Sequence, residues 1–323
     1  MKQIRLFILV ICFSSLGTAQ TVVKDSETQQ PVSYATISFG NGQGIFADDE
    51  GLFIFKEKLY SDVDSLFISA LGYEDLSLST ANLPNHILLK PEAFDLDEVV
   101  LNITSKKYKV EKLKPSIDDD YFKCWLPTIE SEIAVYFPYN GKLQQIESVL
   151  FPISVESKDW KKRKQSNAEK KSFSTLFKVK FYKNDNGQPG DILIYENIVF
   201  RATEKNAKIF DLNVSEYNIT VPKDGLFVSL QVLGYTDKNG KLLPNKKYKE
   251  IKTNRGIVKI PTNFRPLLPF TDKISEKRTF VKRVFINDND WERFEKKNIK
   301  DSNLLAKGLN NYGVGLNLRT FKD

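Results

Sequence analysis

Apolar and polar residues alternate with a period of two along most of this chain. The segments LFIFKEK (52–58), SLFISAL (65–71) and LFKVKFYK (176–183) are short and rich in aromatic or β-branched residues, and Gly, Asn, Asp or Pro punctuate the gaps between them. This pattern is typical of antiparallel strands joined by turns. No stretch longer than about ten residues keeps one apolar helical face. The sequence therefore predicts an all-β protein.

The expected strands between residues 20 and 101 follow one another at regular intervals, which predicts a small antiparallel sandwich. Asp48, Asp49, Glu50 and Gly51 separate two aromatic strands in this segment. Asp and Gly are the residues that a tight turn requires, and Gly accepts a positive φ without steric cost. We therefore interpret the acids as the solvated tip of a hairpin and not as a metal or catalytic cluster.

A set of positions between residues 20 and 101 carries a resemblance to a known family. These positions are Asp25, Thr28, Pro31, Val32, Ala35, Ile37, Asp49, Gly51, Phe53, Ser69, Gly72, Tyr73, Leu96, Asp97, Glu98 and Val99. Through them, residues 20–101 resemble the carboxypeptidase-like regulatory domain of Bacteroidota proteins. The resemblance implies a transthyretin-like (prealbumin-like) sandwich of seven or eight strands. It also implies a binding or spacing module, because that family has no peptidase activity of its own.

A charged segment separates this domain from a second β-rich region. Residues 102–131 contain many lysines, Pro115 and the acidic triplet 118–120, and we interpret them as a linker. The strand pattern resumes over 132–323 with less regular spacing, which favours a larger two-sheet sandwich. This region resembles a jelly-roll-like β-sandwich that follows the regulatory domain in surface proteins. A membrane barrel is disfavoured because charges fall on every face of several segments.

The first nineteen residues have the layout of a secretory signal peptide. Lys2 and Arg5 precede an apolar run over 6–13, and small residues lead up to Ala19. The run is too short to span a bilayer, so we expect no transmembrane segment in the mature chain. Export to the periplasm, the outer-membrane surface or the medium follows, and Cys124 would then be the one cysteine left. Export also disfavours nucleic acid as a partner, although the pI is about 9.0.

The strongest basic run is DWKKRKQSNAEKK at 159–171, which places a tryptophan beside several cations. A solvated loop is the simpler interpretation. The alternative is a contact with an anionic partner such as a phosphorylated lipid or glycan. Trp160 of this run and Trp291 could each pack in the core or contact a ligand. The candidate ligand contacts are Trp160, Lys161, Lys162, Arg163 and Trp291.

Two oxygen-rich loops, NDNGQPGD (184–191) and NDND (287–290), could hold calcium, but they lack regular ligand spacing and also suit simple turns. Their candidate ligands are Asp185, Asp191, Asp288 and Asp290. We predict no other cofactor.

The sequence contains no recognisable catalytic motif. His86, the sole histidine, falls in an expected strand, and no pair of acids stands out by spacing. We therefore expect an exported, non-catalytic binding or assembly module at the cell envelope, with a protein or glycan as partner. The alternatives are a carbohydrate-binding accessory protein and a hydrolase with unidentified acids. The sequence does not indicate an oligomeric state.

Overall fold

The computed structural model describes residues 20–92, 107–118, 120–165, 167–206, 208–244, 249–254, 256–260, 262–287 and 290–322. The predicted signal peptide, 1–19, lies outside them. The all-β prediction is confirmed, since the described elements are strands apart from short 3-10 turns and the four-residue helix α1 (Asn303–Ala306). No helix in these ranges is long and apolar enough to cross a bilayer.

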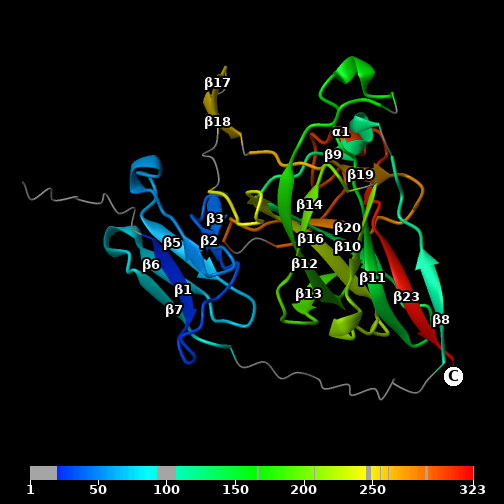
Figure 1. Ribbon diagram of the computed structural model, residues 1–323, viewed down its shortest axis with the longest axis horizontal. Helices are drawn as coiled ribbons and strands as arrows, with labels where there is room; N and C mark the ends of the chain where they lie inside the picture. The colour runs from blue at the N-terminus through cyan, green and yellow to red at the C-terminus, as the bar shows by residue number, and fades with distance from the viewer. Residues whose placement is uncertain are drawn as a thin grey trace, which may run out of the picture.

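The N-terminal unit, residues 20–92, packs two small sheets against each other (Figure 1). One sheet has the order β4-β1-β7 and the other β3-β2-β5-β6. The pairing of β1 with β7 is parallel, so the first and last strands of the unit lie side by side. The strands are β1 (Thr21–Asp25), β2 (Thr36–Ser38), β3 (Gly44–Phe46), β4 (Leu52–Phe53), β5 (Ser65–Ser69), β6 (Leu76–Ser79) and β7 (His86–Leu89).

The core of this unit follows from the alternation in its strands. Val23 and Ile87 from one sheet meet Ile37 and Leu66 from the other, and all four are almost completely buried. Burying a large aliphatic side chain contributes about 1.5–3 kcal/mol. The strand count of seven lies within the predicted range, and the transthyretin-like arrangement remains a prediction.

The turn around Asp48 differs from the expected hairpin. β3 and β4, which flank it, belong to different sheets, so the turn crosses from one sheet to the other. Asp48 itself is buried, and its Oδ1 accepts hydrogen bonds from the backbone N–H groups of Glu50 (3.0 Å) and Leu52 (2.9 Å). Its carboxylate organises the crossing, whereas its neighbours Asp49 and Glu50 are exposed as predicted.

The second unit is a larger sandwich. A seven-stranded sheet has the order β13-β12-β16-β10-β20-β21 with β14 beside β12, and a four-stranded sheet has the order β15-β11-β23-β8. These strands are β8 (Tyr108–Leu113), β10 (Ser131–Phe137), β11 (Gln144–Pro152), β12 (Ser174–Asp185), β13 (Gln188–Ile192), β14 (Ile198–Thr203), β15 (Ile209–Asn213), β16 (Leu226–Tyr235), β20 (Thr279–Arg283), β21 (Glu292–Arg293) and β23 (Gly315–Phe321).

Two further small sheets complete the second unit. One joins β17 (Lys249–Thr253) to β18 (Gly256–Ile260), and the other has the order β22-β19-β9. Its strands are β9 (Cys124–Trp125), β19 (Leu268–Thr271) and β22 (Asn311–Tyr312). The main core lies between the two large sheets, where Val135, Phe151, Phe181 and Val228 are buried together. The jelly-roll-like connectivity remains a prediction.

The predicted linker is largely part of this second unit. Within 102–131, residues 108–113 form β8, which pairs antiparallel with β23 over six registered residue pairs, and β9 pairs with β19. β8 is an edge strand whose side chains are mostly exposed, so its charged composition suits solvent on both faces. The description of this stretch as a linker is therefore corrected for residues 107–131.

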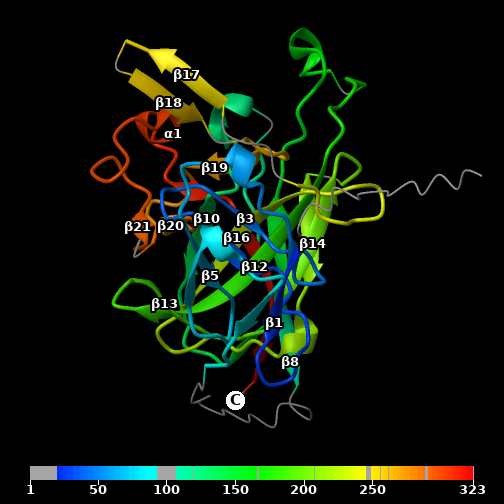
Figure 2. The same cartoon turned by 90° about the vertical axis from the view of Figure 1, so that its left-hand side faces the viewer.

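The two units are docked through the loop between β2 and β3. The backbone N–H of Gly42 and the hydroxyl of Ser38 both donate to the carbonyl oxygen of Phe285, each at 2.9 Å. At the other side of the contact, the Lys241 ammonium lies 3.7 Å from Asp48 and 3.5 Å from Glu50. Figure 2, turned so that the N-terminal unit faces the viewer, shows this unit in front of the seven-stranded sheet.

Candidate functional site

An aromatic and cationic cluster stands at the top of the second unit, on the green loop and the teal turn beside it (Figure 1). Tyr121 and Phe122 come from the 3-10 turn η3 (Tyr121–Lys123), and Trp160 comes from η4 (Trp160–Lys162). The Trp160 ring centroid lies 5.2 Å from that of Tyr121 and 5.6 Å from that of Phe122. We call these three rings, together with Lys161, Lys162, Arg163 and Lys307, the tip.

Cations cover part of the aromatic surface of the tip. The Arg163 guanidinium carbon lies 3.9 Å from the Trp160 ring centroid, and the Lys307 ammonium lies 5.0 Å from that of Phe122. Such contacts contribute about 0.5–1 kcal/mol each at an exposed site. Trp160 therefore has no broad open face for a sugar ring. Phe122, which is 58% exposed, offers more free aromatic surface than Trp160 at 43%.

Local capping explains why both short turns form. The Asp120 carboxylate accepts a hydrogen bond from the backbone N–H of Phe122 (3.0 Å), and the Asp159 carboxylate accepts one from that of Lys161 (2.9 Å). Aspartate is a preferred residue at the start of a helical turn because it satisfies a backbone N–H that has no helical partner. The two caps hold Phe122 and Trp160 toward each other.

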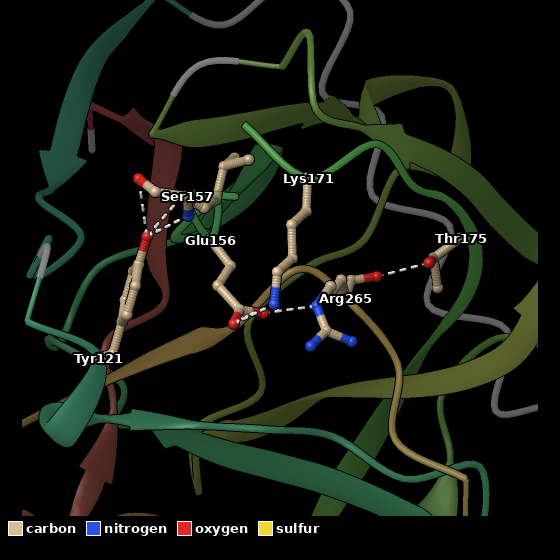
Figure 3. A network of polar contacts seen from close by, with 7 residues as sticks. Tyr121, Glu156, Ser157, Lys171, Thr175 and Arg265 are labelled. Carbon is tan, nitrogen blue, oxygen red and sulfur yellow. Dashed lines mark hydrogen bonds and ion pairs between the residues drawn. The ribbon is translucent and has the colours of Figure 1, made fainter. Parts of the chain in front are cut away.

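A polar network at the base of the loop fixes the tip to the sandwich (Figure 3). The Glu156 carboxylate lies between two cations, with Oε1 2.6 Å from the Lys171 ammonium and Oε2 2.6 Å from Nε of Arg265. Burial alone would raise the pKa of Glu156, but these two cations outweigh it and lower that pKa. The Tyr121 hydroxyl accepts a hydrogen bond from the backbone N–H of Ser157 (2.5 Å). The loop is thus anchored on both of its strands.

The predicted basic contacts Lys161 and Lys162 lie on the exposed side of the tip. Lys162 is 4.0 Å from Asp159, a distance at which an exposed ion pair contributes little. Their charges, with those of Arg163 and Lys307, are therefore available to an anion from solution. The structure brings together four of the five predicted contact residues and adds Phe122 and Lys307, which sequence reasoning missed because their proximity depends on tertiary packing.

Trp291, the fifth predicted contact, lies elsewhere. Its ring packs edge-on against Tyr182 at a centroid distance of 5.4 Å, on the outer face of the seven-stranded sheet. The side chain is only partly exposed. Its assignment as a ligand contact stays a prediction.

The calcium candidates do not converge. Asp185 ends β12, and Asp191 lies in β13. Asn186 and Gly187 join the two strands and have φ values of 50° and 87°. These angles fit the two-residue Asn-Gly hairpin turn. Asp290 is exposed, and Asp288 lies outside the described residues. Among the residues that the structure describes, no group of three His, Cys, Asp or Glu side chains could hold a metal ion.

No family model matches this chain, and no curated protein matches it. Among solved structures, it is similar to the cysteine protease and lectin-like domains of Cwp84, a surface layer associated protein of Clostridium difficile, at 12% identity and a TM-score of 0.32. That match covers 59% of this chain and 32% of the other. A clostridial Cwp84 cysteine protease after propeptide cleavage gives 11% identity and a TM-score of 0.34, covering 66% and 40%. The chain thus spans less than half of either structure.

Proposed function

We propose that this chain is an exported, non-catalytic binding module of the cell envelope that uses the tip to hold an anionic glycan. The observation that carries the proposal is the exposed position of Phe122 and Trp160 among four cations on an anchored loop. Aromatic rings contact the apolar side of a sugar, and guanidinium and ammonium groups pair with its phosphates or carboxylates.

Two features of the tip support binding over a purely structural role. Trp160 and Phe122 are 43% and 58% exposed and adjoin each other, and exposed apolar side chains that form a patch can mark a binding site. The anchoring through Glu156 also keeps the loop from collapsing on the sandwich, so little ordering is required when a ligand arrives. The resemblance of residues 20–101 to a non-enzymatic regulatory domain agrees with this proposal.

The test is a glycan array probed with the purified chain and with two charge-matched variants. K161Q/K162Q removes two tip cations, and K56Q/K58Q removes two exposed cations from the N-terminal unit. We expect binding to phosphorylated or uronic-acid glycans, a loss of about fivefold or more in K161Q/K162Q, and no change in the control. Mass spectrometry of the recovered glycan should show it intact.

Three results would contradict the proposal. Silence on every anionic glycan would exclude this ligand class and leave an envelope protein as the partner. An equal loss in both double variants would show that net charge, and not the tip, determines binding. Cleavage of the recovered glycan would favour a hydrolase.

A further inference from the structure

A cleft of about 560 Å³ lies at the seam between the two units, far from the tip. The N-terminal unit contributes the turn between β5 and β6, including Gly72 and Tyr73, and the second unit contributes β12, β13 and Tyr195. Its volume falls within the range of about 300–1,000 Å³ that is usual for small-molecule sites. Lysines 178, 180 and 183 line it on one side.

Lys178 and Lys180, which line the cleft, belong to a polar row on the outer face of the seven-stranded sheet. Lys178 of β12 is registered with Gln231 of β16, which is registered with Glu132 of β10, and Glu132 is registered with Lys282 of β20. Residues opposite one another in a sheet have Cβ atoms about 4.5–5.5 Å apart, so these side chains are neighbours. Lys178, Gln231 and Glu132 are each at most 5% exposed.

Glu132 is fully engaged by the protein itself. One carboxylate oxygen lies 2.9 Å from the Lys180 ammonium, and the other accepts hydrogen bonds from the hydroxyls of Tyr182 (2.8 Å) and Ser229 (2.6 Å). Burial raises the pKa of Glu132, but Lys180 and the two hydroxyls outweigh it, so the net shift is downward. The carboxylate therefore stays charged and neutralises Lys180.

Lys178 and Gln231 have no such partner. Among the residues that the structure describes, none forms a hydrogen bond or ion pair with the Lys178 ammonium, and Nε2 of Gln231 is buried without an acceptor. Burial, and then the nearby Lys180 ammonium, lower the pKa of Lys178 to about 7. The enclosed Nε2 of Gln231 is a cost to the folded protein, whereas Lys178 lines the cleft, where its ammonium can meet an anion.

The charges around the cleft favour a singly charged group over a phosphate. Asp75, Glu92 and Asp191 also line the cleft, and they would repel a dianion. A carboxylate brings one negative charge to the Lys178 ammonium and can accept charge-assisted hydrogen bonds from it. Glu132 already forms such a pair with Lys180, so this face of the sheet accommodates a carboxylate beside an ammonium.

We infer that the cleft between the two units binds a small carboxylate-bearing molecule, whose carboxylate pairs with Lys178. The rest of the ligand lies toward Tyr73 and Tyr195 and contacts both units. This site does not depend on the proposed function of the tip, and either can fail without the other.

The probes for the test are N-acetylglycine, its uncharged analogue N-acetylglycinamide and inorganic phosphate. Binding is measured by calorimetry and by the NMR signals of the lysine side chains in the purified chain. K178M removes the ammonium and keeps the length of the side chain, Q231L removes the amide donor, and K205M removes an exposed lysine as the matched control. Thermal melting checks that each variant is folded.

We expect the wild type to bind N-acetylglycine with a shift of the Lys178 signal and to bind the amide at least about tenfold more weakly. K178M should lose about tenfold or more in affinity, whereas Q231L and K205M, which keep the Lys178 ammonium, should lose none. Equal affinity of wild type and folded K178M would overturn the proposal, as would equal binding of acid and amide. Preference for phosphate over N-acetylglycine, or no binding of any carboxylate at millimolar concentration, would overturn it too.

Discussion

The ring of Phe46 packs against the ring of Phe285 at a centroid distance of 5.1 Å, and this pair joins the two units. Phe46 belongs to β3 of the N-terminal unit but is buried in the main core of the second unit. The carbonyl of Phe285 also accepts the two hydrogen bonds from Ser38 and Gly42. The contact combines buried aromatic surface with directed polar bonds, so the units are expected to unfold together.

Gly44→Ala should weaken this contact. A Cβ at position 44 would lie 2.4 Å from the Phe285 ring and 2.5 Å from the carbonyl oxygen of Ile37, and a backbone oxygen cannot move aside easily. We expect a loss of about 1–3 kcal/mol in the free energy of unfolding, measured by urea denaturation. Ser77→Ala, at an exposed position of β6, is the control and should stay within about 0.5 kcal/mol of wild type. Equal stability of both variants would show that the contact tolerates expansion.

Glu132→Gln should destabilise the second unit. It would leave the Lys180 ammonium without its buried counter-charge, and breaking a buried pair in this way typically costs about 3–5 kcal/mol. Glu292→Gln, on exposed β21, serves as the control. Because the pKa of Glu132 is lowered in the folded chain, its contribution is present above the unfolded pKa of about 4.5 and is lost as pH falls through the folded value. The difference between wild type and E132Q should therefore shrink only below about pH 4.5; a difference that does not change with pH would contradict this.

Lys178→Met should stabilise the ligand-free protein in a pH-dependent way. A lysine whose pKa is about 7 when folded and about 10.5 when unfolded opposes folding most strongly below pH 7, and this effect fades as pH rises to about 10.5. The gain from K178M should thus be of the order of a few kcal/mol at pH 6 and small at pH 10. Denaturation of both proteins across this range measures it. A gain that is the same at both ends would mean that Lys178 titrates normally.

Glu156→Gln should loosen the loop that carries the tip. The variant removes the charge that holds Lys171 and Arg265, so trypsin should cut the basic stretch 161–164 several times faster than in wild type. The control is Glu169→Gln, because Glu169 pairs with Lys158 on the exposed side of the same loop and such pairs contribute about 0–1 kcal/mol. Similar cleavage rates in the two variants would show that Glu156 does not anchor the loop.

The alternation of side chains predicted most of the strands correctly because each sandwich has an apolar core between its two sheets. Strands such as β12, with Phe177, Val179 and Phe181 directed to the core, carry the signal in their own residues. β8 does not, since YKVEKL is exposed and becomes a strand only by pairing with β23. Local pattern therefore detects buried strands and misses edge strands that are specified by their partner.

The two candidate sites also differ in how much of each can be predicted from the sequence. The basic run with Trp160 is contiguous and visible in the sequence, whereas Phe122 joins it from a segment some forty residues away. The row of Lys178, Gln231 and Glu132 depends on the register of three strands, and nothing near any one of them marks it. The alternation of lysines with apolar residues in β12 predicts a strand and gives no sign of this row. This row is buried where the two units meet, and no local sequence pattern encodes such a tertiary contact.

The parallel pairing of β1 with β7 has a mechanical consequence. Four registered residue pairs, from Val22 with His86 to Asp25 with Leu89, join the first and last strands of the N-terminal unit. Tension applied through the chain on either side would pull these strands along their length in opposite directions. All the hydrogen bonds between them would then be loaded together in shear rather than opened one after another. Such an arrangement resists traction better than the small core of this unit alone would suggest.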